Sequence, residues 1–332
     1  MPFGRIMGVV STLTALVAAA VVVPSLAAAE PDAAPVVADD GARVVKETAV
    51  DARTLDLEIA SPALGENRSV RLLLPTGWTE RPTRTWPLLY LLPGCCADED
   101  YRTWTEYTDA QRFLADKNVL TVLPSDGRAG MFSRWWNQGV SPAPDWEAFH
   151  VTEVRQILER GYGAGDRRAA AGLSIGGFGA MAYAFRNRGM FGAAAAFSAS
   201  IDTLQGWTPG AIQGILQNEG FDPADLWGDP VLNRPLWSEH NPADHPAELR
   251  GVALYVACGN GEPGPLDPPG QEPEQHEALS LASSQSFTDR LRANGVPVTT
   301  HYYGPGTHDW AYWERELHSS WPTLARGLGL PA

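Results

Sequence analysis

Gly172-Leu173-Ser174-Ile175-Gly176 is the stretch of this chain that decides the fold. The spacing Gly-x-Ser-x-Gly is typical of a nucleophile elbow, a sharp turn that holds a serine between a strand and a helix. Small residues are needed on both sides of the serine, because the backbones crowd there. Residues 168–171 predict a short buried strand, and residues 177–185 predict a helix of small and apolar residues. We therefore predict that Ser174 is a nucleophile, in preference to an idle serine in a glycine-rich turn.

Strands and helices alternate on both sides of this turn. An antiparallel pair is predicted at 55–60 and 70–74, and further strands are predicted at 87–92, 119–123, 192–198, 252–258 and 296–303. Helices are predicted at 105–117, at 146–161, up to Asn294, and at 310–326. Continuous apolar strands between helices indicate a mostly parallel central sheet that is covered on both faces. Together with the elbow, this order predicts an α/β-hydrolase fold.

Residues 201–249 break the alternation. They contain three tryptophans, several prolines and one helical pattern near 211–217. We expect an insertion over the C-terminal edge of the sheet, where ligand sites of open α/β sheets lie. The residues alone leave two roles open, substrate binding and a surface excursion without function, and long segments of this kind are usually functional.

The first 29 residues have the features of a signal peptide. Arg5 is the only charge, residues 7–23 are apolar, and Ala27-Ala28-Ala29 offers a cleavage site before Glu30. Residues 30–48 are rich in Ala, Pro, Val and Asp, which predicts a flexible linker. Residues 49–332 remain for a single catalytic domain. The protein is therefore expected to be secreted, outside the cell or in the cell envelope.

The chain is acidic, and this limits its partners. Its net charge is −14, and loss of Arg5 with the signal peptide makes it −15. Nucleic acid and anionic membrane surfaces repel such a chain, so no nucleic-acid partner is expected. Charged residues make up 19% and hydrophobic residues 44%, which allows a sizeable core. The charge leaves association with the cell envelope open, and it does not indicate an oligomeric state.

The chain has three cysteines, Cys95, Cys96 and Cys258. An odd number in an exported protein leaves at least one thiol unpaired. Because a disulfide between neighbouring residues departs from the usual geometry, we expect buried free thiols. A thiol nucleophile is not expected, since no partner histidine is suggested nearby.

A serine nucleophile needs a positioned base, and the sequence offers seven histidines. His308 lies in a loop between the last predicted strand and the last predicted helix, where this fold delivers its base. We therefore predict His308 as the base. His301 falls within a strand and His318 on a helix. His240 and His245 lie in a polar segment without metal-ligand spacing, which favours a solvated face, and no metal or cofactor is predicted.

The acid of the triad should follow the strand that ends at Cys258. Glu262, Asp267, Glu272, Glu274 and Glu277 all meet this order. Reasoning from the residues alone does not choose among them.

The oxyanion hole requires two backbone N–H groups. One should belong to Ile175, which follows the nucleophile. The other should come from the loop after the strand that ends at Leu92, where Cys95 is the best donor. Plain packing is the alternative role for Cys95 and Cys96.

Taken together, these motifs resemble the esterase D family, and most closely its secreted mycolyltransferase branch of the antigen 85 type. The resemblance covers about residues 55–324. It rests on Leu91-Leu92-Pro93-Gly94, Asp100-Tyr101, Trp104, Phe132-Ser133-Arg134-Trp135, Gly172-Leu173-Ser174, Leu226-Trp227-Gly228, Cys258-Gly259-Asn260-Gly261, and Gly306-Thr307-His308-Asp309-Trp310 with Trp313.

The resemblance implies an acid at the start of the helix before the final strand, and counting back from Gly295 places it at Glu277. It also implies Cys95 and Ile175 as oxyanion donors, and it puts Cys258 near the site without a catalytic role. Trp135 and Trp310 belong to its motifs and offer apolar surface to a substrate.

The chain departs from the mycolyltransferases at two positions. That branch has an aspartate before the oxyanion glycine and an arginine two residues after it, and both help to hold trehalose. Here the positions are Pro93 and Cys96, so a charged pair able to grip a polyol is missing. The paired cysteines of the branch's surface loop near residues 141–145 are also missing. The acyl-serine chemistry is therefore expected to transfer, and the trehalose acceptor is not.

The sequence thus predicts a secreted serine esterase or acyltransferase with a Ser174–His308–Glu277 triad and an acyl-enzyme intermediate. Its partners would be acyl esters or lipids. Transfer of long acyl chains to a sugar or lipid alcohol, as by a mycolyltransferase or diacylglycerol acyltransferase, is the alternative. A non-catalytic extracellular binding protein on a hydrolase scaffold is an alternative of another class.

Overall fold

A computed structural model of the chain describes Gly4 and residues 36–79 and 82–332. Apart from Gly4, the predicted signal peptide and the first part of the predicted linker lie outside these residues. Nine strands form one sheet in the order β1-β2-β3-β5-β4-β6-β7-β8-β9. The strands are β1 Arg43–Asp51, β2 Thr54–Ser61, β3 Glu66–Leu73, β4 Trp86–Leu92, β5 Leu120–Pro124, β6 Ala164–Leu173, β7 Ala193–Phe197, β8 Ala253–Cys258 and β9 Thr299–Tyr302.

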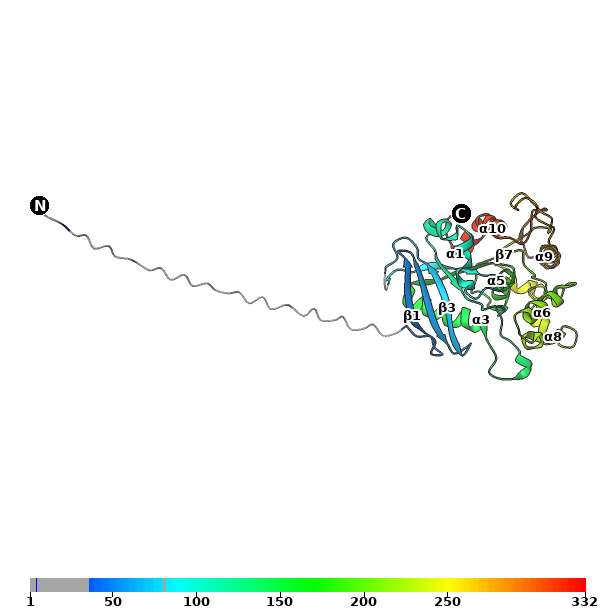
Figure 1. The fold of residues 1–332 in the computed structure, drawn as a ribbon, viewed down its shortest axis with the longest axis horizontal. Helices are drawn as coiled ribbons and strands as arrows, with labels where there is room; N and C mark the ends of the chain where they lie inside the picture. The colour runs from blue at the N-terminus through cyan, green and yellow to red at the C-terminus, as the bar shows by residue number, and fades with distance from the viewer. Residues whose placement is uncertain (1–3, 5–35, 80–81) are drawn as a thin grey trace. The chain divides into compact units, whose positions relative to one another are not determined.

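The sheet is antiparallel at one edge and parallel elsewhere. The pairs β1–β2, β2–β3 and β3–β5 are antiparallel, whereas every pair from β5 through β4, β6, β7 and β8 to β9 is parallel. Figure 1 shows β1 and β3 at the left of the domain, with α9, α6 and α8 on the opposite side. This arrangement confirms the predicted α/β-hydrolase fold with a mostly parallel sheet.

Ten α-helices are described. They are α1 Thr103–Tyr107, α2 Ala110–Phe113, α3 Trp146–Ala148, α4 Arg155–Ile157, α5 Ile175–Arg186, α6 Thr208–Asn218, α7 Pro223–Trp227, α8 Arg234–His240, α9 Gln275–Ala293 and α10 Trp310–Leu328. π-helical turns at Phe149–Val154 and Leu158–Tyr162 join α3 and α4 into one helical run, which matches the prediction at 146–161.

The helices cover both faces of the sheet. Successive side chains of a strand point to opposite faces, so Leu88, Tyr90 and Leu92 of β4 belong to one core cluster and Leu89 and Leu91 to another. The first cluster includes residues of α5, α9 and the 146–162 helix, and the second includes residues of α2 and α10. In Figure 1, α10 lies above the sheet with α1, and α3 lies below it.

The linker prediction is wrong over its last six residues. Residues 43–48 belong to β1, which pairs with β2 along its length. Eight of its nine residues are exposed, because β1 is an edge strand that packs on the core only through Val44. Such a strand needs no apolar alternation, so its sequence lacks the usual signal.

The helix predicted at 105–117 is divided. Thr108 has an extended backbone (φ −137°, ψ 173°) between α1 and α2, and a 3₁₀ turn at Leu114–Asp116 follows. The Thr108 hydroxyl is within hydrogen-bond distance of the Trp104 carbonyl and of the Ala110 N–H, so the side chain bridges the break.

The predicted insertion is present and more helical than expected. It comprises α6, α7, α8 and 3₁₀ turns at Pro242–Asp244 and Pro246–Leu249, all between β7 and β8. The expectation of a solvated face is wrong for His240, which is only 6% exposed. Its ring stacks on Trp227 with 5.0 Å between ring centroids, so apolar packing inside the insertion buries it.

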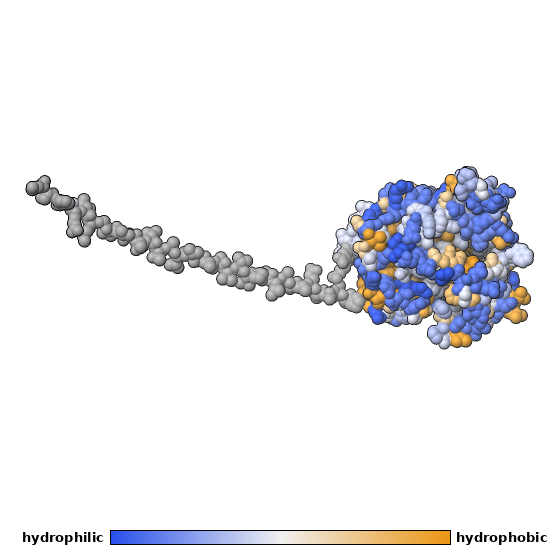
Figure 2. Space-filling view, in the orientation of Figure 1, coloured by the Kyte–Doolittle hydropathy of each residue, from blue (hydrophilic) through white to orange (hydrophobic). Residues whose placement is uncertain are grey.

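Crossing a membrane as a helix requires a long apolar segment. None of the described helices is both long and apolar enough to cross a bilayer. The face in Figure 2 is mostly hydrophilic, and its hydrophobic residues are scattered in small groups.

Two buried carboxyl groups meet near the end of β5: Asp126 follows that strand, and Asp100 lies in the 3₁₀ turn before α1. Asp126 donates its backbone N–H to Asp100 Oδ2 at 2.6 Å, and its own carboxylate accepts the Phe132 N–H. Burial raises the pKa of Asp100 from 3.8 to about 7. Burial and the charge of Asp100 raise the pKa of Asp126 well above its usual value.

These shifts predict a pH-dependent cost. A carboxyl group whose pKa is raised by folding makes the folded state less stable as the pH rises toward that pKa. The reason is that the unfolded chain loses this proton at lower pH than the folded chain does. The substitution Asp126→Asn should therefore change the free energy of unfolding more favourably at pH 8 than at pH 5. The stability difference from wild type should shift in the variant's favour by up to about 1.4 kcal/mol per pH unit. Urea unfolding at both pH values measures it. The exposed Asp116→Asn is the control, and an equal difference at both pH values would contradict the assignment.

Candidate active site

The elbow places Ser174 between β6 and α5. The serine has φ 52° and ψ −123°, a strained backbone conformation for a residue with a side chain. A Cβ at Gly172 would lie 2.3 Å from the Gly176 carbonyl oxygen, and one at Gly176 would lie 2.3 Å from that of Pro93. Only glycine fits at either place, which is the physical reason for the Gly-x-Ser-x-Gly spacing.

Ser174 is held by its backbone while its hydroxyl stays available. Its N–H donates to the Phe197 carbonyl at 2.9 Å, which ties the elbow to the end of β7. Among the described residues, no hydrogen bond engages Ser174 Oγ. A catalytic hydrogen bond is often long or poorly aligned before substrate binds, so this geometry is compatible with a nucleophile.

His308 and Glu277 form a hydrogen-bonded pair. His308 Nδ1 lies 2.7 Å from Glu277 Oε2, and the carboxylate is fully buried. A carboxylate accepts the proton on Nδ1, which leaves Nε2 unprotonated and able to act as a base.

The second oxygen of Glu277 is also occupied. Oε1 accepts the Gly259 N–H at 2.7 Å and the Ser198 hydroxyl at 2.8 Å. A buried carboxylate with both oxygens satisfied cannot rotate freely, so it fixes the orientation of the imidazole.

The parallel strands bring these groups to one edge. Ser174 follows β6, Ser198 follows β7, Gly259 follows β8, and His308 lies in the loop after β9. These four strands are neighbours in the sheet and run in the same direction, so all four loops emerge at its C-terminal edge.

Glu277 is the member of the five candidate acids that contacts the imidazole. Two others hold the loop instead. Glu274 accepts the His308 backbone N–H at 2.7 Å, while Asp267 accepts the Tyr312 hydroxyl at 2.8 Å and bonds the Thr307 hydroxyl. Sequence order could not separate these roles, because all five residues lie in the single segment between β8 and the body of α9.

Two aromatic rings pack on His308, and sequence reasoning missed one of them, His276. His276 lies edge-to-face with it at 4.5 Å between centroids, and Trp313 does so at 4.9 Å. Burial, together with the charge of His308, lowers the pKa of His276 to about 4. His276 is therefore neutral at ordinary pH and adds no positive charge next to the base. No motif pointed to His276, whereas Trp313 was already part of the histidine motif.

The two predicted oxyanion donors belong to segments that meet at the elbow. Ile175 is the first residue of α5, so its N–H has no partner within the helix. The loop that carries Cys95 packs on the elbow, since a Cβ at Gly94 would lie 2.5 Å from Leu173 Cδ1 and 3.5 Å from Ser174 Cβ. The N–H of Cys95 makes no backbone hydrogen bond among the described residues.

The cysteine prediction is wrong in one part. Cys95 and Cys96 are joined by a disulfide, and Cys95 is exposed. The two cysteines are neighbours in the chain, in the loop that packs on the elbow, so no other segment has to bring their sulfurs together. Cys258 is a buried free thiol, as expected.

The two predicted substrate residues lie apart. Trp310 is half-buried two residues after His308, and it packs edge-to-face with Trp313 at 5.0 Å and stacks on Tyr107 at 5.1 Å. Trp135 is 5% exposed and lines a cavity to which Ser174, Glu277 and His308 do not contribute. In the part of the chain described, no three His, Cys, Asp or Glu side chains are arranged to hold a metal ion.

Comparison with known proteins places this geometry in a family. Residues 61–324 match the family model Esterase, described as "Putative esterase". The chain is 30% identical over 279 residues to "Esterase Rv1288" of Mycobacterium tuberculosis, covering 81% of this chain and 58% of that protein. It therefore spans little more than half the length of that relative.

Two further relatives match over most of their length. "Diacylglycerol acyltransferase/mycolyltransferase Ag85B" of Mycobacterium avium is 28% identical over 277 residues, with 81% of this chain and 82% of that protein covered. The crystal structure of M. tuberculosis MPT51 (FbpC1) is 27% identical with a TM-score of 0.67, covering 81% of this chain and 96% of that one. The family match spans most of the chain and contains the elbow, the buried carboxylate and the histidine loop, and this chain accordingly belongs to the esterase family of α/β-hydrolases.

Proposed function

We propose that this protein is an exported serine esterase that forms an acyl-enzyme on Ser174, with His308 as base and Glu277 as the acid. The observation that carries the proposal is the 2.7 Å contact between Glu277 Oε2 and His308 Nδ1 at the sheet edge where Ser174 lies. Glu277 is fully buried and held through both oxygens, so its role is to orient and stabilise His308.

The proposed reaction has two halves. His308 Nε2 takes the proton of Ser174 Oγ as the oxygen attacks the ester carbonyl, and the N–H groups of Cys95 and Ile175 hold the oxyanion that forms. The alcohol leaves with the proton from His308. Water then attacks the acyl-serine, again with His308 as base, and releases the acid.

An acyl ester or lipid is the proposed substrate. Trp310 and Tyr107 give a partly exposed aromatic surface beside His308, and Tyr107 is 59% exposed. Such a surface suits an apolar acyl group. Trp135 lies in a separate cavity, so any contact it makes with substrate would be with a part remote from the ester.

Acyl transfer is the second candidate, and the 28% identity to the Ag85B mycolyltransferase favours it. Hydrolysis and transfer use the same catalytic residues and differ in the acceptor that attacks the acyl-serine. The direct experiment supplies a p-nitrophenyl ester with and without competing alcohols and identifies the products. Free acid as the dominant product supports the proposal, acyl esters as the dominant product support the second candidate, and no turnover would leave only a binding protein.

Trehalose is expected to be a poor acceptor. Pro93 has neither charge nor N–H, and Cys96 lies in a disulfide where the mycolyltransferases have an arginine. Each charge-assisted hydrogen bond lost costs about 1.5–3 kcal/mol. Two such losses weaken acceptor binding by roughly two to four powers of ten. The measurement is acyl transfer to trehalose against hydrolysis of the same donor, and efficient trehalose ester formation would refute it.

Export is part of the proposal and rests on the sequence of residues 1–29. The charge on Arg5, the apolar run and the alanines before Glu30 are its support. Intact-mass measurement of protein collected outside the cells should give a chain that starts at Glu30. Association with the cell envelope predicts the same mature chain in the envelope fraction.

A further inference from the structure

A disulfide lies in the loop that is proposed to supply one half of the oxyanion hole. It joins Cys95, the proposed donor, to its neighbour Cys96. The proposed reaction uses the backbone N–H of Cys95 and neither sulfur. Cys95 is exposed and Cys96 is half-buried, so reagents in solution can reach the bond between them.

Both ends of this loop are fixed by other parts of the fold. At its start, the Leu92 carbonyl accepts the Trp104 Nε1–H at 2.9 Å, and Gly94 packs on the elbow. At its end, the buried Asp100 accepts a backbone N–H from the segment after β5. Between these points, residues 95–97 make no hydrogen bond among the described residues. The disulfide is therefore the bond that restrains the middle of the loop.

The position of the Cys95 N–H depends on what lies on either side of it. On one side is Gly94, where a Cβ would lie 2.5 Å from Leu173 Cδ1, so this residue has little room to shift. On the other side is the covalent ring that the disulfide closes. That ring contains the peptide bond between Cys95 and Cys96, and it restricts rotation about the bonds within it. The N–H is thus held between two restrained points, and opening the ring releases one of them.

The placement of this N–H has a direct effect on the rate. A donor of an oxyanion hole is effective because it is in place before the negative charge develops, and loss of one donor costs about 10²–10³ in kcat. A donor that is loosened but still present should cost less. Because the oxyanion develops only as the ester is attacked, the loss should fall on kcat and leave KM nearly unchanged.

We propose that the Cys95–Cys96 disulfide positions the Cys95 N–H, so that the enzyme is fully active only while this disulfide is intact. The inference rests on the proposed acyl-enzyme mechanism, in which that N–H holds the oxyanion. The two cysteines are positioning residues that act through the backbone. Activity is thereby tied to an oxidising environment outside the cytosol, and a chain that is still in the reducing cytosol has low activity.

Reduction of the pair requires a dithiol. A thiolate of the dithiol attacks one sulfur of the disulfide, the other cysteine leaves as a thiolate, and a mixed disulfide forms. The second thiol of the reductant then closes a cyclic disulfide and releases the attacked cysteine. Two electrons and two protons pass from the dithiol to the pair, which becomes two thiols. The third cysteine, Cys258, is fully buried, so it does not exchange with either sulfur.

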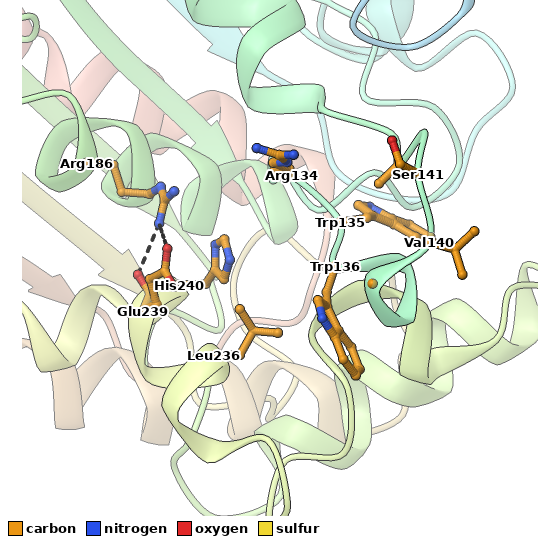
Figure 3. A pocket seen from close by; sticks show the side chains of 11 residues that line it. Arg134, Trp135, Trp136, Val140, Ser141, Arg186, Leu236, Glu239 and His240 are labelled. Atoms are coloured by element: carbon orange, nitrogen blue, oxygen red, sulfur yellow. Dashed lines mark hydrogen bonds and ion pairs between the residues drawn. The ribbon is translucent and has the colours of Figure 1, made fainter.

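The disulfide is separate from the cavity of about 390 Å³ that is shown in Figure 3. That cavity is lined by residues of the segment between β5 and α3 and of the ends of α5 and α8, and by neither cysteine. A change of activity on reduction is therefore expected to arise at the oxyanion hole.

Steady-state hydrolysis of a p-nitrophenyl ester before and after reduction tests the proposal. The protein is purified in air, treated with dithiothreitol, freed of reagent without air, and assayed. Alkylation of the unfolded protein should modify one cysteine before reduction and three after it. Reduction should lower kcat about ten- to a hundredfold with KM within about twofold, and reoxidation should restore kcat. The thermal midpoint should change little, because a disulfide between neighbours closes the shortest loop.

Two variants separate the disulfide from other effects of the reductant. Cys95→Ser/Cys96→Ser keeps the backbone N–H and forms no disulfide, so its kcat should equal that of the reduced wild type and should not respond to dithiothreitol. Asp98→Asn is the matched control in the same loop. The Asp98 side chain is 80% exposed and pairs with Arg128 at the surface, so this variant should keep the wild-type kcat and the wild-type response to reduction.

The possible failures are distinguishable. An active enzyme whose kcat is unchanged after complete reduction would overturn this inference and leave the proposed function standing. No hydrolysis in either state would remove the proposed function and this inference with it. Three alkylated cysteines before reduction, or a fall in kcat that accompanies an equal loss of folded protein, would also overturn the inference. So would a response of the double variant to dithiothreitol, because the reductant would then act elsewhere.

Discussion

Replacing Ser174 by alanine is expected to lower kcat for a p-nitrophenyl ester at least about a thousandfold, and His308→Ala should do the same. Without Oγ no acyl-enzyme forms, and without the imidazole the hydroxyl keeps its proton. A triad acts as a unit, so the double variant should be barely worse than either single variant. Steady-state hydrolysis of the three variants and the wild type measures this.

Two controls separate catalysis from folding. Ser174→Ala removes one oxygen that makes no hydrogen bond among the described residues, so its thermal unfolding should match the wild type. The histidine removed in His318→Ala lies on α10 and is hydrogen-bonded to the side chain of Asp109. This variant should retain its kcat, and retained activity in Ser174→Ala would exclude the nucleophile assignment.

Glu277→Gln is expected to cost about a hundredfold to ten-thousandfold in kcat. The carboxylate accepts His308 Nδ1 on one oxygen and the Gly259 N–H and Ser198 hydroxyl on the other. A glutamine has a single oxygen, so its NH₂ must face one of these donors. Either the imidazole takes the wrong tautomer, or the Gly259 N–H is left unpaired in a buried place.

Glu262→Gln is the matched control for that change. Glu262 is exposed and contacts Asn260, so its substitution should leave kcat near the wild-type value. Glu274→Gln should fall between the two, because Glu274 bonds only the backbone N–H of His308. If Glu262→Gln proves more damaging than Glu277→Gln, the acid has been assigned wrongly.

Some features were predictable because a local constraint fixes them. The elbow requires Gly172 and Gly176, because a Cβ at either residue would lie 2.3 Å from a backbone carbonyl oxygen. The apolar run of β4 reflects burial on both faces of the sheet. The position of His308 follows from the order of strands, since its loop joins β9 to α10. Each of these signals can be read within a short window of sequence.

Other features depend on contacts between distant segments. β1 packs on the core through Val44 alone, so its pairing with β2 is what identifies it as a strand. His240 looks polar in sequence and is buried because Trp227 stacks on it. The acid could not be chosen from order alone, because the choice depends on which carboxylate the start of α9 turns toward His308.

The central claim is that Ser174 is the nucleophile that carries the acyl group, and covalent labelling of its hydroxyl tests it most directly. The wild type is incubated with a fluorophosphonate, whose phosphorus is attacked by the nucleophilic oxygen with loss of fluoride. Unreacted reagent is removed, and the labelled peptide is identified by mass spectrometry. The account predicts a single adduct on Ser174 and no adduct in Ser174→Ala. Esterase activity should fall in proportion to labelling and be lost when labelling is complete. An adduct on another residue, or an active enzyme with Ser174 fully labelled, would contradict it.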